Sequence, residues 1–91
     1  MMRVALEVRE YDRPTIYCYV ELDACNNILR YALKALRDEM KYWDGKKLLK
    51  VWVNGKPLND PKTDIETRLT QGDKIKIYIP PDYGIDLWQV D

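Results

Sequence analysis

Cys18 and Cys25 are the two side chains with the most direct capacity for covalent chemistry. They lie seven positions apart, which is neither the spacing of a CxxC redox pair nor that of a zinc knuckle. Cys25 falls close to the expected start of a helix, where the helix N-terminus favours a thiolate. No base accompanies it in the sequence. We therefore expect two reduced, mostly buried thiols and no catalytic cysteine.

The residue types that the chain lacks limit its chemistry further. It contains no histidine, no serine and no phenylalanine, which excludes Ser–His and Cys–His nucleophile pairs and imidazole metal sites. Paired carboxylates such as Asp38 and Glu39 lie in a charge-rich stretch typical of a solvated surface. A carboxylate or lysine enzyme stays open, but we expect a protein that is not an enzyme and needs no cofactor and no metal.

Alternating apolar and polar residues predict the strands that must position the remaining side chains. Turn residues separate the strands, and Asn54-Gly55 provides a turn with positive φ into a short fourth strand. Between the last two strands we expect a loop with one helical turn. The predicted strands cover 3–10, 15–22, 47–53, a short segment around Leu58, and 74–79. The residues expected to face inward are Val4, Leu6, Val8, Ile16, Cys18, Val20, Leu22, Leu49, Val51, Val53, Ile75, Ile77 and Ile79.

One long helix follows the second strand. Leu29, Leu33, Leu36 and Met40 recur at helical spacing. An Asp or Asn at position 23, 26 or 27 is expected as the N-cap, and Gly45 as the residue that ends the helix. Because one helix must cover the inward face of all the strands, the sequence predicts a two-layer α+β domain.

Several motifs in the C-terminal half of the chain resemble those of one known family. They are Val53-Asn54-Gly55, Thr67-x-Leu69, Gly72-Asp73-x-Ile75-x-Ile77 and Pro80-Pro81-x-x-Gly84. In this pattern the chain resembles the β-grasp (ubiquitin-like) sulfur carriers, a family that includes the molybdopterin synthase small subunit and the thiamine sulfur-carrier protein. The resemblance covers roughly residues 3–84. It implies a mixed sheet of four to five strands packed on one long helix, with the last strand central, as a β-grasp domain over 1–84 and a C-terminal extension over 85–91.

The tail departs from the family pattern. Sulfur carriers end in Gly-Gly, and an activating enzyme adenylates the terminal carboxylate before it becomes a thiocarboxylate. Here Pro80 and Pro81 stop the last strand and Gly84 matches the first glycine, but the stiff, β-branched Ile85 stands in the second position. Three interpretations stay open: a carrier activated by trimming at Gly84, a relative that kept the fold and lost the carrier chemistry, and an unrelated use of the fold.

Strand phasing places four aromatic rings on the sheet face away from the helix. Exposed rings on one face tend to mark interaction sites. An alternative is that the apolar tail with Trp88 folds back over this face. The candidate partner-binding residues are Tyr17, Tyr19, Trp52, Tyr78 and Trp88.

Basic residues suggest two further interpretations. Arg3, Arg9, Lys50, Lys74 and Lys76 share the aromatic face, and rings among cations also suit single-stranded nucleic acid. A zero net charge and the carboxylates of Glu7 and Glu21 on this face argue against that use. A basic stripe on the helix is either a solvated face or a site for an acidic partner. The stripe consists of Arg30, Lys34, Arg37 and Lys41.

The leading hypothesis from the sequence is a small cytoplasmic protein-binding module that docks a partner through the aromatic face and the tail. The charge is unevenly distributed, with eight basic and three acidic residues in 24–58, and a polarised surface favours oriented encounters with a protein. The resemblance implies an activating or cofactor-biosynthesis enzyme as one such partner. The alternatives are the trimmed sulfur carrier and a nucleic-acid-binding domain. No membrane association is expected.

Overall fold

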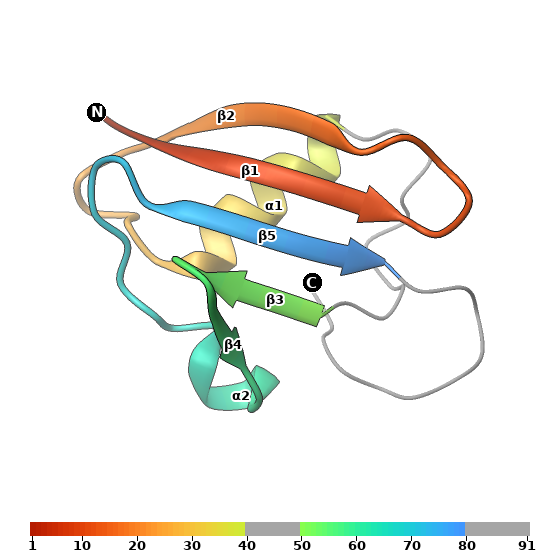
Figure 1. The fold of residues 1–91 in the computed structure, drawn as a ribbon. Helices are drawn as coiled ribbons and strands as arrows, with labels where there is room; N and C mark the ends of the chain where they lie inside the picture. Colours follow the sequence, from red (N-terminus) through yellow and green to blue (C-terminus); the bar gives the residue numbers. More distant parts are fainter. Residues whose placement is uncertain (40–49, 80–91) are drawn as a thin grey trace.

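The computed structural model of the chain describes residues 1–39 and 50–79, which form an α+β domain with one long helix and a mixed sheet (Figure 1). Met40, Lys41, Gly45 and Leu49, and with them the predicted helix end, lie outside the described residues. The elements are β1 (Met2–Glu10), β2 (Ile16–Leu22), α1 (Leu29–Glu39), β3 (Lys50–Val53), β4 (Lys56–Leu58), α2 (Pro61–Asp64) and β5 (Lys74–Ile79).

The five described strands form one sheet in the order β2-β1-β5-β3-β4. β1 and β5 pair in parallel, and every other pair of neighbours is antiparallel. The last strand is therefore central, as expected, and it lies beside the strand that carries Trp52. β5 can occupy this position because Ile75, Ile77 and Ile79 are all buried on one face.

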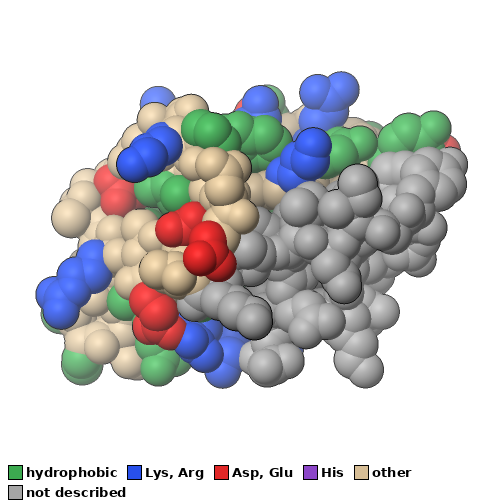
Figure 2. Space-filling model, turned by 90° about the horizontal axis from the view of Figure 1, so that it is seen from below, with side chains coloured by type: hydrophobic (Ala, Val, Ile, Leu, Met, Phe, Trp, Pro, Cys, Tyr) green, Lys and Arg blue, Asp and Glu red, His purple; other side chains and the backbone are tan. Residues whose placement is uncertain are grey.

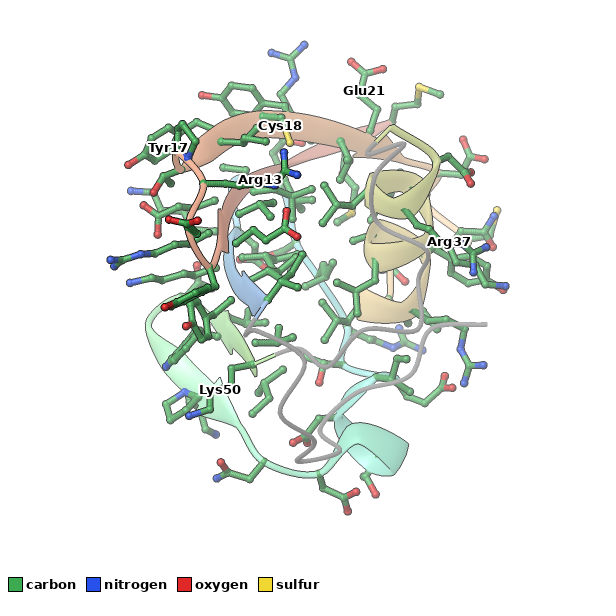
Figure 3. All side chains as sticks on the ribbon, turned by 90° about the vertical axis from the view of Figure 1, so that its right-hand side faces the viewer. Arg13, Tyr17, Cys18, Glu21, Arg37 and Lys50 are labelled. Carbon is green, nitrogen blue, oxygen red and sulfur yellow. The ribbon has the colours of Figure 1, made fainter. Side chains whose placement is uncertain are left out.

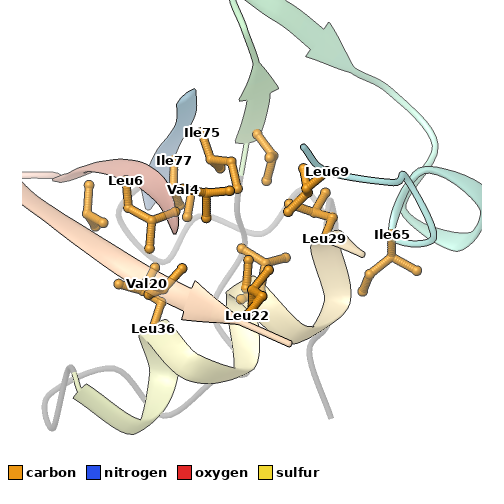
Figure 4. Packing of buried hydrophobic residues seen from close by; sticks show 14 of the residues in the cluster. Val4, Leu6, Val20, Leu22, Leu29, Leu36, Ile65, Leu69, Ile75 and Ile77 are labelled. Atoms are coloured by element: carbon orange, nitrogen blue, oxygen red, sulfur yellow. The ribbon is translucent and has the colours of Figure 1, made fainter. Parts of the chain in front are cut away.

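The core lies between this sheet and α1, which crosses one face of it (Figures 1 and 4). Each fully buried Leu or Ile contributes roughly 1.5–3 kcal/mol to folding. Three of the described residues predicted to face inward are not fully buried. Ile16 and Cys18 lie on the edge strand β2, where Ile16 is 38% exposed and Cys18 only partly buried, and Val53 at the end of β3 is also only partly buried. The buried residues include Val4, Leu6, Val8, Val20, Leu22, Leu29, Ala32, Leu33, Leu36, Val51, Ile75, Ile77 and Ile79.

The first turn of α1 differs from the prediction. The helix begins at Leu29, so the Asp or Asn expected as N-cap lies too early in the chain. The backbone N–H of Leu29 instead donates to the carbonyl of Thr67 (2.9 Å), and that of Arg30 to the carbonyl of Ile65 (3.0 Å). A distant loop thus satisfies N–H groups that a side-chain cap satisfies in most helices.

The segment between β4 and β5 contributes more to the core than its irregular sequence suggests. The predicted helical turn is present as α2. Ile65 and Leu69, which the alternation pattern does not predict as core residues, are both buried (Figure 4). The same segment that supplies the carbonyls for α1 therefore also closes the core beside it.

Two turns with positive φ are joined to each other by side chains. Asn54 (φ 52°) and Gly55 (φ 81°) turn β3 into β4, as the Asn-Gly pair predicts, and Gly72 (φ 85°) precedes β5. The Asn54 side chain donates from Nδ2 to Asp73 Oδ1 (3.0 Å) and accepts at Oδ1 from the Lys74 N–H (3.0 Å). These bonds fix the start of the central strand against β3.

Cys18 and Cys25 form no disulfide with each other, and the expectation that both are mostly buried is wrong for one of them. Cys18 is partly buried against the core, whereas Cys25 is exposed. No helix in residues 1–39 or 50–79 is long and apolar enough to cross a membrane.

Candidate interaction surface on the outer face of the sheet

The sheet face opposite α1 carries the aromatic side chains that the sequence singled out. Figure 3 shows Tyr17 and Lys50 on the side of the sheet away from α1. Tyr17 is 74% exposed and Tyr19 is 65% exposed. Trp52 and Tyr78 are half-buried. We call this surface the outer face.

Strand register brings three of the four rings toward a common centre. In one row across the outer face, Tyr17 lies opposite Glu7, Glu7 opposite Lys76, and Lys76 opposite Trp52. Tyr17 on the β2 edge and Trp52 on β3 therefore flank a charged pair. Rings at both ends of such a row can hold an apolar group between them.

The neighbouring row contains the feature that the sequence analysis missed. Ala5 lies between Tyr19 of β2 and Lys74 of β5, and its methyl group is too small to fill the space between the longer side chains. The outer face is hollowed here, with a volume of about 610 Å³, and Gly55 lines one end of the hollow. An alanine at an outward position between Arg3 and Glu7 is the signal that marks this site in the sequence.

Tyr78 does not belong to this hollow. It lies in a third row, opposite Arg9 of β1 and Lys50 of β3. With the β1–β2 turn it lines a separate hollow of about 500 Å³. The four predicted rings therefore form two groups on the outer face rather than one patch.

The charge of the outer face is positive but partly compensated. Lys76 Nζ lies 3.8 Å from Glu7 Oε2 and 5.6 Å from the centre of the Trp52 ring. Arg3 bonds to Glu21 (3.3 Å) and lies over the Tyr19 ring (5.5 Å). The basic residues on this face are Arg3, Arg9, Lys50, Lys74 and Lys76, against the carboxylates of Glu7 and Glu21. The surplus cations favour an acidic counterpart.

The basic stripe on α1 is interrupted by partners from its own chain. Arg30 forms an ion pair with Glu66, and Lys34 lies over the Tyr31 ring at 5.9 Å. Arg37 occupies the last turn of α1, and Lys41 lies outside the described residues. On the side shown in Figure 2, carboxylates gather near the middle and basic side chains toward the margins. An acidic partner for this stripe stays a prediction.

Residues 1–39 and 50–79 contain no group of three or more His, Cys, Asp or Glu side chains that could hold a metal ion. Burial alone raises the pKa of Asp73, but hydrogen bonds from Asn54 and Thr70 to its charged carboxylate outweigh burial and hold this pKa below the ordinary value of 3.8. The bonds from Thr70 come from its N–H (2.8 Å) and its hydroxyl (3.0 Å). Asp73 therefore stabilises the turn that precedes β5.

The tail predictions concern residues that the structure does not describe. Pro80, Pro81, Gly84, Ile85 and Trp88 all lie beyond Ile79, the last described residue. Whether the tail carries partner-binding or carrier chemistry stays a prediction.

The structure defines the class as a small α+β domain with one long helix on a five-stranded mixed sheet. No family model matches the chain, and no curated protein matches it. Among solved structures, the chain is similar to the solution structure of the Haloferax volcanii HVO 2177 protein. The two are 22% identical over 90% of this chain and 88% of that chain, with a TM-score of 0.57. The likeness is one of fold.

Proposed function

We propose that the chain is a non-enzymatic protein-binding module with a β-grasp fold of the sulfur-carrier type, and that its outer face docks an acidic protein surface. The fold part of this proposal rests on the strand order β2-β1-β5-β3-β4, on the parallel pairing of β1 with β5, and on the position of α1 between β2 and β3 in the chain. The motifs around Asn54-Gly55 and Gly72-Asp73 are consistent with this assignment.

The observation that carries the docking function is the hollow over Ala5. Exposed Tyr17 and Tyr19 stand on one side of it and Trp52 on the other. Binding energy at protein interfaces concentrates in aromatic residues around a centre that excludes water. An apolar side chain of the partner fits between the rings, and acidic residues around it face Lys74 and the other surplus cations.

The same rings and cations suit single-stranded nucleic acid less well. Glu7 lies in the middle of the outer face, where a phosphate backbone would meet its negative charge. Lys76 and Arg3 are already engaged by carboxylates of their own face. Nucleic-acid affinity depends on cations free to replace the counterions of the phosphates, so we favour a protein partner.

Quantitative affinity capture from the native cell tests the proposal. Full-length wild-type chain, Tyr17→Ala, Trp52→Ala and Tyr31→Ala serve as baits, since Tyr31 is an exposed aromatic on α1 and provides the matched control. We expect one or more proteins to be lost with Tyr17→Ala and Trp52→Ala but kept with Tyr31→Ala. Calorimetry with the purified partner should then show an affinity loss of about tenfold or more for each outer-face variant.

Two results would contradict this function. One is that the outer-face variants keep every protein that the wild-type chain captures. The other is that labelled single-stranded RNA or DNA binds the wild-type chain at low salt and loses affinity with the same variants. Intact mass analysis of the chain from its native cell addresses the carrier alternative, which requires a species that ends at Gly84.

A further inference from the structure

The hydrogen bonds of β1 show which backbone groups of β2 point away from the sheet. The N–H of Ala5 donates to the carbonyl of Asp73 (2.9 Å), and the carbonyl of Arg3 accepts from the N–H of Gly72 (3.0 Å). Odd-numbered residues of β1 therefore bond on the β5 side. Because bonding alternates along a strand, even-numbered residues of β1 bond to β2, and their partners in register are the even-numbered residues of β2.

The odd-numbered residues of β2 consequently turn their backbone groups outward. These residues are Tyr17, Tyr19 and Glu21, and β2 is an edge strand of the sheet (Figure 1). In the part of the chain that the structure describes, the backbone N–H and C=O groups of these three residues form no hydrogen bond to another segment. Among the described residues, the N–H and C=O groups along the outer edge of β2 thus have no backbone partner, and such a row is a template for another strand.

The sequence of β2 lacks the features that keep edge strands apart. Exposed edges are protected by lysine, proline, bulges or short length. Ile16–Leu22 is seven residues long and contains no proline and no basic residue. The only ionised side chain in the strand is Glu21, and Arg3 of β1 neutralises it.

We propose that a second copy of this chain adds to this edge, with the two β2 strands antiparallel and a two-fold axis at Tyr19. Tyr19 is the middle residue of Ile16–Leu22, so this register pairs the whole strand with the whole strand of the second copy. Tyr17 then lies opposite Glu21, and Tyr19 opposite Tyr19. All three outward residues are used, which gives about six backbone hydrogen bonds.

The inner face of β2 supports the same register. Ile16 is an exposed apolar residue on the face that otherwise packs against α1. A hollow of about 600 Å³ lies along the β2 edge and reaches both faces of it, with a lining that consists of Met1, Arg3, Tyr19, Val20, Glu21 and Ala35. In the proposed register Ile16 of one copy lies opposite Leu22 of the other, and Cys18 lies opposite Val20. Apolar side chains of the second copy then lie at this hollow.

Charge favours a second copy over a charged partner strand. The chain has a net charge of zero, so two copies do not repel each other at long range. The neutral, self-complementary edge selects neither an acidic nor a basic segment. Pairing at the backbone edge joins the outer faces of the two copies. The backbone of Tyr17 and Tyr19 then forms the dimer edge, and their rings line the docking surface proposed above.

Sedimentation equilibrium of the full-length chain over about three decades of concentration tests the proposal. We expect a reversible dimer in the wild-type chain and in Tyr19→Val, which keeps the outward N–H. Tyr19→Pro removes that N–H from an edge position where proline is compatible with the sheet. It should weaken self-association by about tenfold or more while circular dichroism shows a folded chain. Trp52→Ala, which weakens partner docking, should dimerise normally.

Disulfide formation tests the register. In the proposed dimer Cys18 and position 20 of the second copy form a non-hydrogen-bonded pair about 4.5 Å apart at Cα, which is within disulfide range. Val20→Cys in a Cys25→Ala background should cross-link rapidly under mild oxidation, and Leu22→Cys in the same background should not. A wild-type chain that stays monomeric at every concentration, or a dimer that Tyr19→Pro and Tyr19→Val affect equally, would overturn the proposal.

Discussion

Asp73 connects the turn that precedes the central strand β5 with the β3–β4 turn at Asn54-Gly55. Its carboxylate accepts hydrogen bonds from Asn54 and from the N–H and hydroxyl of Thr70, and its carbonyl accepts from the N–H of Ala5. Each side-chain bond is made to the charged form of Asp73. Protonation of the Asp73 carboxylate therefore weakens the hydrogen bonds that hold the start of β5 against the end of β3.

We expect acid to destabilise the fold through this residue. Because the folded-state pKa of Asp73 lies below the ordinary value of 3.8, its contribution to stability is present above that value and is lost as pH falls through the folded-state pKa. Urea unfolding between about pH 5 and pH 2 should show a smaller loss of unfolding free energy for Asp73→Asn than for the wild-type chain. Asp23→Asn, at an exposed position, should follow the wild-type curve. An Asp73→Asn curve parallel to the wild-type curve would contradict this account.

Ala5 offers a second test at the scale of one residue. Ala5→Leu fills the hollow on the outer face without entering the core, because Ala5 points away from α1. We expect binding of the captured partner to fall by about tenfold or more while the melting temperature changes little. Ala5→Ser, which leaves the hollow nearly as large, is the matched control. Unchanged binding by Ala5→Leu would show that the hollow is not the docking site.

At the scale of secondary structure, the strands could be predicted because each carries its own pattern. The alternation in β1, β2 and β5 and the Asn54-Gly55 turn are local signals, and the structure confirms these elements. The start of α1 could not be predicted, because its first N–H groups bond to carbonyls of a loop more than thirty residues away. The candidate site was predicted in part. The alternation within each strand predicts which rings lie on the outer face. The hollow could not be predicted, because it depends on the register that places Ala5 between Tyr19 and Lys74 of neighbouring strands.

Leu69 tests how much the irregular segment before β5 contributes. It is buried in the core although it lies outside every strand and helix. We expect Leu69→Ala to lower the free energy of unfolding by about 2–5 kcal/mol, the range for truncating a leucine buried in a packed core. Leu58→Ala, at a half-buried position in β4, should cost less. Chemical denaturation of both variants measures the difference, and equal small losses would assign Leu69 a minor role.

At the scale of the whole molecule, the neutral net charge conceals an outer face with surplus cations. Attraction to an acidic partner across this face is screened by salt, with a Debye length of about 10 Å at 0.1 M and about 3 Å at 1 M. We expect the association rate with the captured partner to fall steeply with ionic strength and the dissociation rate to change little. Stopped-flow or surface-plasmon measurements on the wild-type chain and Lys74→Gln check this, and the variant should show a weaker salt dependence.

The central position of β5 also affects how the chain folds as a ribosome makes it. β5 is the last of the described elements to be synthesised, yet it lies between β1 and β3. Until residue 79 has emerged, the β1–β2 hairpin and the β3–β4 hairpin have no strand between them, and each presents an unpaired edge. The sheet therefore forms late in synthesis. Nascent chains that stall before residue 74 should be substrates for chaperones, because their apolar strands have no central partner.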